Sequence, residues 1–244
     1  MKKLIPSSLR LKLKLVLRFL SDVRSGQYSK IVRSSQTQTQ HFEPRAEVVQ
    51  VLKVANYSEN KRKNLTIAAT QIQNVIIQPG KIFSFWALVG APVAKHGYQE
   101  GRALVSGQLK AVMGGGLCQL SGILYYLTLK AGLTPIERYP HSTDIYTDVT
   151  RFTPLGSDAT VVYGYKDLRF INSLSQPICF RISITTDQIT GELCTPDPIP
   201  VYHIEFRTQK RSDFTQVETF RSPIVSSNQS SPTVLKPIAV SHYR

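Results

Sequence analysis

Apolar residues recur at helical spacing over residues 117–131, and Gly132 follows at the position where glycine commonly ends a helix. This pattern predicts a helix that is buried along one face. A second helix is predicted for residues 65–77. Alternation and turn residues predict β-structure at residues 98–112, 159–170, 178–193 and 201–206. The sequence therefore predicts an α+β fold, in which a central cysteine-bearing helix packs on an antiparallel sheet.

Residues 9–23 follow the pattern of a basic amphipathic helix. On a helical wheel Arg10, Lys14 and Arg18 cluster on one side, while leucine and valine side chains spread over the other. Basic helices of this kind commonly lie in the interface of a membrane. The alternative is a helix that packs its leucines on the folded domain and leaves its charges in water. The sequence leaves both interpretations open.

The chain is strongly basic, with 30 Lys and Arg against 16 Asp and Glu and a formal net charge of +14. Residues 1–33 alone hold nine basic residues against one acid, Asp22. A field of this sign attracts anionic surfaces, so an anionic membrane is one expected partner. Nucleic acid is not an expected partner, because no nucleic-acid-binding motif accompanies the charge.

These patterns divide the chain into a basic N-terminal helix (residues 1–33), a polar linker (34–45), a folded domain (46–221) and a disordered tail (222–244). No apolar run approaches the ~20 residues that cross a bilayer. Charged residues also interrupt the apolar region that a signal peptide needs. Three cysteines are too few for a disulfide framework and indicate a reducing compartment. We therefore predict a cytoplasmic protein, peripheral on the inner face of the plasma membrane if its first helix binds lipid.

The stretch MGGGLCQL places three glycines directly before a cysteine, Cys118, at the first turn of the predicted central helix. Unpaired backbone N–H groups and the positive end of the helix dipole stabilise a thiolate there, and also an oxyanion formed by its attack on a carbonyl. The alternative is a cysteine that only fills core space. The glycines lack the Lys-Ser or Lys-Thr of a phosphate-binding loop, and no Cys/His spacing suits zinc. Neither a cofactor nor a metal is predicted.

His141 is the candidate base for this thiol. The helix rises ~20 Å between Cys118 and Ala131, and the extended chain that follows spans up to roughly 26 Å. The chain is therefore long enough to run back along the helix and bring His141 to Cys118. Candidates for a third group that orients the imidazole are Asp144, Asp148, Asp158 and Asp167.

Five motifs in the same order resemble the VanW family: KIFSFWALVG, GGGLCQLSGILYY, ERYPHS, PLGSDATVVYGYKDLRFIN and QPI. The resemblance covers about residues 65–182. It implies a link to peptidoglycan or envelope metabolism, because the family is named for an accessory protein of vancomycin-resistance clusters. The chain resembles the short form of the family, without the extracytoplasmic repeats of longer relatives. The family has no assigned biochemical activity, so the resemblance supplies no reaction.

The resemblance also marks candidate site residues. We predict Cys118 as nucleophile, His141 as general base, and Asp167 or Asp158 as the orienting group. Backbone amides of residues 116–119 are predicted to form the oxyanion site, and Arg138 to hold a substrate carboxylate. The full set of predicted substrate or oxyanion residues is Gly114, Gly115, Gly116, Gln119, Arg138, Ser142 and Tyr163. A cysteine at a helix start, then a histidine, then a polar residue near a strand is similar to the core of papain-like and NlpC-type hydrolases.

Two functions of different classes follow from these residues. The first is a cysteine-dependent amidase, peptidase or acyl transferase that acts on a cell-envelope precursor. The second is a binding module that recognises an envelope peptide or phosphate through the glycine loop and His141 without turnover.

Overall fold

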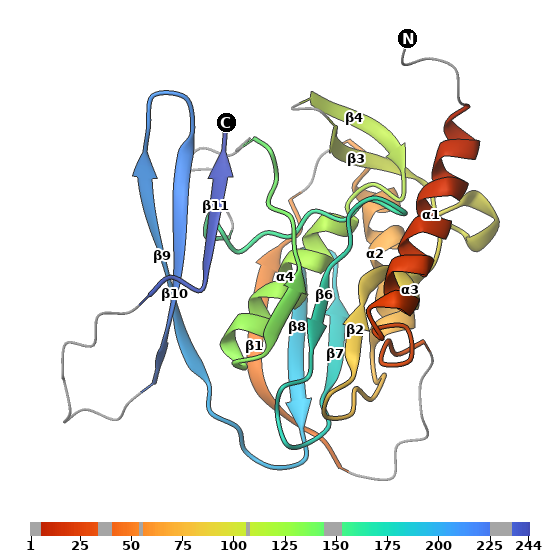
Figure 1. The fold of residues 1–244 in the computed structure, drawn as a ribbon. Coiled ribbons are helices and arrows are strands. Elements are labelled where there is room, and N and C mark those ends of the chain that lie inside the picture. Colours follow the sequence, from red (N-terminus) through yellow and green to blue (C-terminus); the bar gives the residue numbers. More distant parts are fainter. Residues whose placement is uncertain (1–5, 34–40, 54–55, 106–107, 144–152, 225–235) are drawn as a thin grey trace.

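The computed structural model describes residues 6–33, 41–53, 56–105, 108–143, 153–224 and 236–244. The fold is mixed α+β, as predicted (Figure 1). Its helices are α1 (Ser7–Arg24), α2 (Ser58–Ile72), α3 (Phe85–Val89) and α4 (Leu117–Lys130). Its strands are β1 (Glu43–Val51), β2 (Ile82–Ser84), β3 (Glu100–Val105), β4 (Gln108–Met113), β5 (Thr134–Glu137), β6 (Arg169–Ile171), β7 (Cys179–Ile184), β8 (Gln188–Thr195), β9 (Tyr202–Lys210), β10 (Thr215–Pro223) and β11 (Ala239–Tyr243).

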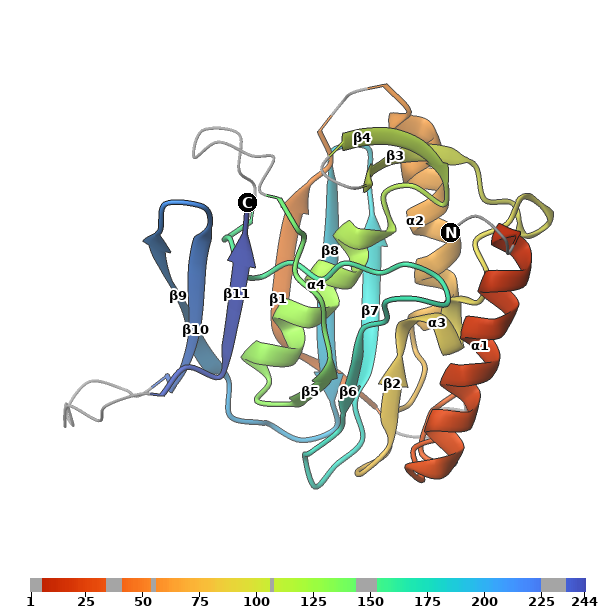
Figure 2. The same cartoon turned by 45° about the horizontal axis from the view of Figure 1, so that its top comes forward.

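The strands form small antiparallel sheets with the orders β1-β8-β7, β2-β6-β5 and β11-β10-β9, and β3 pairs with β4 as a hairpin. Helix α4 lies across the β1-β8-β7 sheet, between the β11-β10-β9 sheet on one side and the β2-β6-β5 sheet on the other (Figures 1 and 2). Helix α1 stands at the far edge, beside α3 and β2. The predicted arrangement of a central helix on an antiparallel sheet is confirmed.

Helix α4 is buried because its apolar residues recur every three or four positions. Leu120, Ile123 and Leu127 are all fully buried. A Cβ atom on Gly191 of β8 would lie 2.5 Å from a methyl group of Ile123. Glycine at this place in the strand therefore lets the helix approach the sheet closely.

The predicted helix at residues 65–77 is displaced. Helix α2 begins at Ser58 and ends at Ile72, and the chain then turns at Asn74, which has a positive φ of 61°. Ile77 is buried in an extended segment that pairs with Ile178. The error arises because the first turns of α2 are polar and carry no apolar periodicity.

The predicted strands at residues 159–170 are also wrong in extent. Only β6, from Arg169 to Ile171, is a strand of this region. The chain before it forms turns closed by a bridge between Val162 and Lys166. This turn-rich segment carries much of the candidate site.

The C-terminal region differs from the predicted disordered tail. β11 pairs in antiparallel register with β10, from Ala239 opposite Thr219 to Tyr243 opposite Thr215. Ser241 is buried at this pairing, so the prediction of disorder is wrong for this strand. Residues 225–235, within the predicted tail, lie outside the described residues, as do residues 34–40 of the predicted linker. β1 already begins at Glu43, within the linker range.

No helix in the described ranges is long and apolar enough to cross a membrane.

Candidate active site

The glycine loop before α4 has a geometry that larger residues do not permit. Gly116 has φ of 102° and packs on the aliphatic stem of Lys61. A Cβ on Gly115 would lie 2.1 Å from the backbone of Gly101 in β3. The glycines are therefore required by left-handed backbone geometry and by the close approach of a neighbouring strand.

Asn64 of α2 holds this loop in place. Its amide nitrogen donates to the carbonyls of Gln99 and Gly115, at 2.9 and 3.0 Å, and its oxygen accepts from the Gln99 amide at 2.8 Å. Asn64 is fully buried, and its bond to the Gly115 carbonyl is buried as well. The loop thereby delivers Cys118 at a fixed position in the first turn of α4.

The Cys118 thiol is half-buried and faces two partners. The sulfur donates to the carbonyl of Val161 at 3.7 Å, and it lies close enough to the His141 ring to raise the pKa of that ring. Ser121, one turn later on α4, donates to the carbonyl of Ala159 at 2.6 Å. These hydrogen bonds hold the turn-rich segment before β6 against the start of α4. Cys118 and His141 lie close together, as the chain length predicted.

His141 lies between the thiol and a carboxylate. Its Nδ1 is 2.6 Å from Oδ2 of Asp158, and its backbone N–H donates to the same oxygen at 2.7 Å. Nε2 is therefore the ring nitrogen left for the Cys118 thiol. Burial opposes a charge on the ring, but hydrogen bonds to Asp158 and Cys118 outweigh it and raise the pKa of His141 from 6.5 to about 10.

Asp158 is held as an anion. Burial favours its protonated form, but hydrogen bonding to His141 and the charge of Arg138 outweigh burial and hold the pKa of Asp158 well below its usual range. Tyr243 of β11 also donates to its Oδ1, at 2.5 Å. We call Cys118, His141 and Asp158 the Cys118 cluster.

The Arg138 side chain forms its hydrogen bonds with groups of the protein itself. Its side chain is only 8% exposed and donates to the carbonyls of Gly156 and Asp158 at 2.9 and 2.7 Å, to Oδ1 of Asp158 at 3.0 Å, and to the hydroxyl of Ser241. Each of the three guanidinium nitrogens therefore has a protein acceptor. Arg138 therefore holds Asp158 in place, and its binding of a substrate carboxylate stays a prediction.

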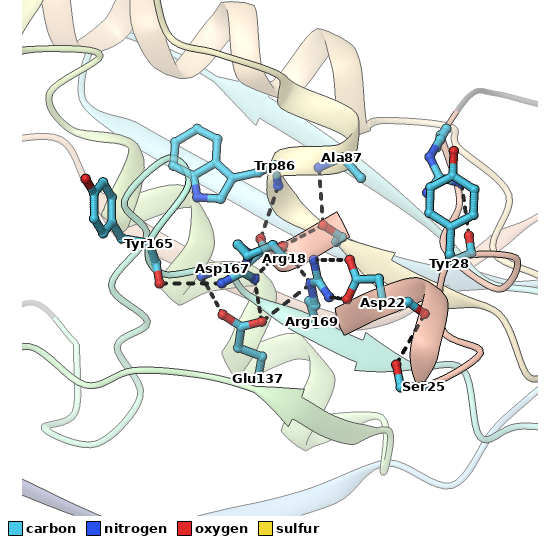
Figure 3. Close-up of polar contacts among 12 residues, drawn as sticks. Arg18, Asp22, Ser25, Tyr28, Trp86, Ala87, Glu137, Tyr165, Asp167 and Arg169 are labelled. Atoms are coloured by element: carbon cyan, nitrogen blue, oxygen red, sulfur yellow. Dashed lines mark hydrogen bonds and ion pairs between the residues drawn. The ribbon is translucent and has the colours of Figure 1, made fainter. Parts of the chain in front are cut away.

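Asp167 belongs to a separate buried network and does not orient His141 (Figure 3). Its carboxylate accepts from Ser84 at 2.6 Å, from Arg169 at 2.9 Å and from the backbone N–H of Trp86 at 3.1 Å. Of the two leading candidates for the orienting group, the structure brings Asp158 to His141. Asp144 and Asp148 lie outside the described residues.

The predicted oxyanion amides are partly occupied. The backbone N–H groups of Gly114, Gly115 and Gln119 donate to the carbonyls of Gln99, Val112 and Gly116. Within the described ranges, the amides of residues 116–118 at the start of α4 donate to no backbone carbonyl. The amides that remain available to an oxyanion are therefore those of residues 116–118, one fewer than predicted.

The remaining predicted residues lie around the Cys118 cluster. The Gln119 side chain donates to the carbonyl of Val51 in β1 at 3.1 Å. Ser142 is exposed next to His141, and its carbonyl accepts from the Arg244 amide. Tyr163 packs edge-on against Trp86. The geometry brings none of these three side chains to the Cys118 thiol.

Sequence reasoning missed Asn64, Ser241 and Tyr243. The Ser-His-Tyr run at the C-terminus follows a polar, low-complexity stretch, which conceals a short strand. No local pattern marks Asn64, because its partners lie 35 and 51 residues away along the chain.

Comparisons with known proteins agree with these motifs. Residues 60–194, more than half of the chain, match the family described as VanW like protein. The chain is 36% identical over 126 residues to the Uncharacterized protein YoaR of Bacillus subtilis, covering 51% of this chain and 40% of the relative. It is 32% identical over 137 residues to the Vancomycin B-type resistance protein VanW of Enterococcus faecalis, covering 56% of this chain and 50% of that protein.

The chain thus spans half or less of the length of these curated relatives. No solved structure matches it. The family match begins in α2, which carries Asn64, and ends at the last residues of β8, so it includes the glycine loop and all three members of the Cys118 cluster. The chain belongs to the VanW-like family.

Proposed function

We propose that this protein is a cysteine-dependent hydrolase or acyl transferase that acts on an amide or ester of a cell-envelope precursor. The observation that carries the proposal is the position of His141, between the thiol of Cys118 and the carboxylate of Asp158. A nucleophile, a base and a group that orients the base form the arrangement that activates a thiol for attack.

The charge distribution supports a reactive thiol. Since the pKa of His141 is raised to about 10, its ring carries a proton at neutral pH. A positive charge beside the sulfur, at the start of a helix, is the environment in which cysteines exist as thiolates. We propose that His141 receives the proton that the Cys118 thiol gives up, and so acts as the predicted base.

The proposed reaction has two steps. The Cys118 thiolate attacks the carbonyl carbon, and His141 donates its proton to the departing amine or alcohol, which leaves a thioester on the sulfur. Water or an acceptor amine then attacks the thioester while His141 takes its proton, and the thiolate is released with the acid or the new amide. We propose that the backbone amides of residues 116–118 stabilise the negative oxygen in both steps.

The order Cys, His, Asp is similar to that of papain-like and NlpC-type hydrolases, and this likeness supports the class of reaction but not a shared fold. The envelope substrate rests on the relative from Enterococcus faecalis that is named for vancomycin resistance. We propose a precursor of the peptidoglycan layer as the substrate class.

Alkylation by iodoacetamide tests the site without knowledge of the substrate. Cys179 and Cys194 are fully buried, so labelling of the folded protein reports Cys118. We expect the rate at pH 6 to exceed that of a free thiol by at least about tenfold, and to fall by a similar factor in His141→Ala. His96→Ala, which removes an exposed histidine outside the site, is the matched control and leaves the rate unchanged.

Two outcomes would contradict the proposal. A Cys118 that reacts like a free thiol in both wild type and His141→Ala has no activating base. A Cys118→Ser variant that keeps full biological activity would favour the binding module instead, because a serine retains the shape of the site but not the thiolate.

A further inference from the structure

Helix α1 carries an unusual apolar surface on its outer side. Its exposed apolar side chains keep between 47% and 55% of their surface accessible. They are Leu9, Leu13, Val16, Leu17, Phe19, Leu20 and Val23. Single exposed apolar side chains are ordinary in soluble proteins, but seven on one helix of 18 residues are unusual. We call this set the α1 outer face.

The α1 outer face points away from the domain because ion pairs attach the opposite side of the helix to it. Asp22 forms a bidentate ion pair with Arg169, at 2.6 and 3.0 Å, and Arg18 pairs with Glu137 at 2.6 Å. These contacts are drawn in Figure 3. They involve partly buried charges, which cost much more to separate than exposed ones.

Packing and pairing secure the helix further. Leu11 lies directly against Gly164, where a Cβ would come within 2.5 Å of its methyl group. After the helix, Ile31 forms a parallel bridge with Ile82 of β2. The alternative in which the leucines pack on the domain therefore holds only for the inner side of α1.

The outer face has the layout of an interfacial helix. At 100° per residue, Leu9, Leu13, Val16 and Leu20 fall within about 60° of each other. The exposed Lys12 flanks this arc on one side and Arg24 flanks it on the other. Apolar side chains bordered by basic ones are the arrangement that binds the headgroup region of a bilayer.

We propose that α1 holds this protein on an anionic lipid bilayer, with the α1 outer face inserted at the interface. The charge of the N-terminal segment favours an anionic bilayer over a second copy of the chain as the partner of this face. Asp22 is the only acid of residues 1–33 against nine basic residues, and it is turned inward to Arg169. A second copy of the chain would bring two strongly basic segments together, which is repulsive, whereas anionic lipid neutralises them. The proposal stands independently of the chemistry of Cys118.

Sedimentation of the full chain with phospholipid vesicles tests this. We expect binding to phosphatidylcholine vesicles that contain phosphatidylglycerol, and at least about tenfold weaker binding to phosphatidylcholine alone, because several basic residues lie near the surface. The double variant Leu13→Gln, Leu20→Gln should lose at least about tenfold in binding, because two leucines no longer insert. Binding should also weaken as salt is added.

The matched control is the double variant Val49→Gln, Val51→Gln. Both valines are exposed on β1, at 46% and 53%, and the control should bind as wild type does. Circular dichroism melting verifies that each variant is folded. Equal binding by wild type and the α1 variant, or no binding of wild type to anionic vesicles, overturns the proposal. A dimer in solution that Leu13→Gln, Leu20→Gln converts to a monomer also overturns it, because the face would then join two copies.

Discussion

Replacing Asp158 by Asn should change how stability depends on pH, because the hydrogen bond to this carboxylate is the largest of the interactions that raise the pKa of His141. In wild type the hydrogen bond and charge of Asp158 help to raise the pKa of His141 from 6.5 to about 10. An asparagine keeps the shape of the side chain but removes the charge. Burial still disfavours the charged ring, and of the two partners Cys118 alone still favours it, so the pKa of His141 falls toward its ordinary value.

The sign and size of the effect follow from linkage. Since the folded pKa of His141 lies above the unfolded one, its contribution is complete below pH 6.5 and is lost as the pH rises through about 10. At about 1.4 kcal/mol for each pKa unit, the upper limit is roughly 5 kcal/mol. The His141 side chain is 27% exposed, and solvent screening reduces the expected loss to about 2–3 kcal/mol.

Urea denaturation at pH 6 to 10 measures this loss. The free energy of unfolding of wild type should decrease by about 2–3 kcal/mol more than that of Asp158→Asn over this range. Groups that titrate in both proteins cancel in the difference. NMR titration of the His141 ring provides the direct check. A ring pKa near 6.5 in wild type, or the same pH dependence in both proteins, would refute the electrostatic reasoning behind the site.

Three further changes test other parts of the structure. Gly115→Ala should destabilise the protein by at least about 3 kcal/mol in urea denaturation, because the new Cβ meets the backbone of Gly101 at 2.1 Å; an unchanged midpoint would contradict the packed loop. Tyr243→Phe removes one hydrogen bond to Asp158, so we expect a loss of about 1 kcal/mol and slower alkylation of the Cys118 thiol; full stability would mean that β11 does not support the Cys118 cluster. Asp22→Asn should raise hydrogen exchange in α1 but not in α4, because it breaks a partly buried ion pair at the domain surface; uniform exchange across the protein would argue against a locally attached helix.

The parts of the fold that local pattern determines were predictable. Helix α4 has apolar residues at every core position and a glycine just beyond its end, so its bounds were found to within one residue. The approach of His141 to Cys118 was also predictable, because helix rise and chain length restrict where the returning segment can go.

The choice between Asp158 and Asp167 was not predictable from local sequence. Both follow turn-rich stretches and carry the same chemistry. Asp167 is engaged by Ser84, which lies 83 residues earlier, whereas Asp158 meets Tyr243, which lies 85 residues later. Pairings over such separations depend on how whole sheets assemble, and a single sequence contains no local signal of them.

For helix α1, the helical wheel predicts that one side is apolar and the other basic, but not which side faces the domain. The sequence placed Arg18 with the other basic residues on a solvated side. In the structure Arg18 points inward, because Glu137 and Asp167 supply negative charge there, at 2.6 and 3.8 Å. The acids that turn the helix lie more than a hundred residues away in the sequence. The side of α1 that faces solvent therefore depends on where the fold places Glu137 and Asp167, which the local sequence does not indicate.

The segment between Asp158 and Asp167 joins the two functions proposed for this protein. The carbonyl of Val161 faces Cys118, and Gly164 lies beneath the inner side of α1. Three residues span at most about 10 Å, and a helix with its side chains is about 10–12 Å across. The thiol therefore lies within roughly 25 Å of the α1 outer face. For a protein seated on a bilayer through that face, the thiol is therefore no more than about 25 Å from the lipid surface. A membrane-linked precursor whose polar head extends from the bilayer by up to this distance can place its carbonyl at Cys118.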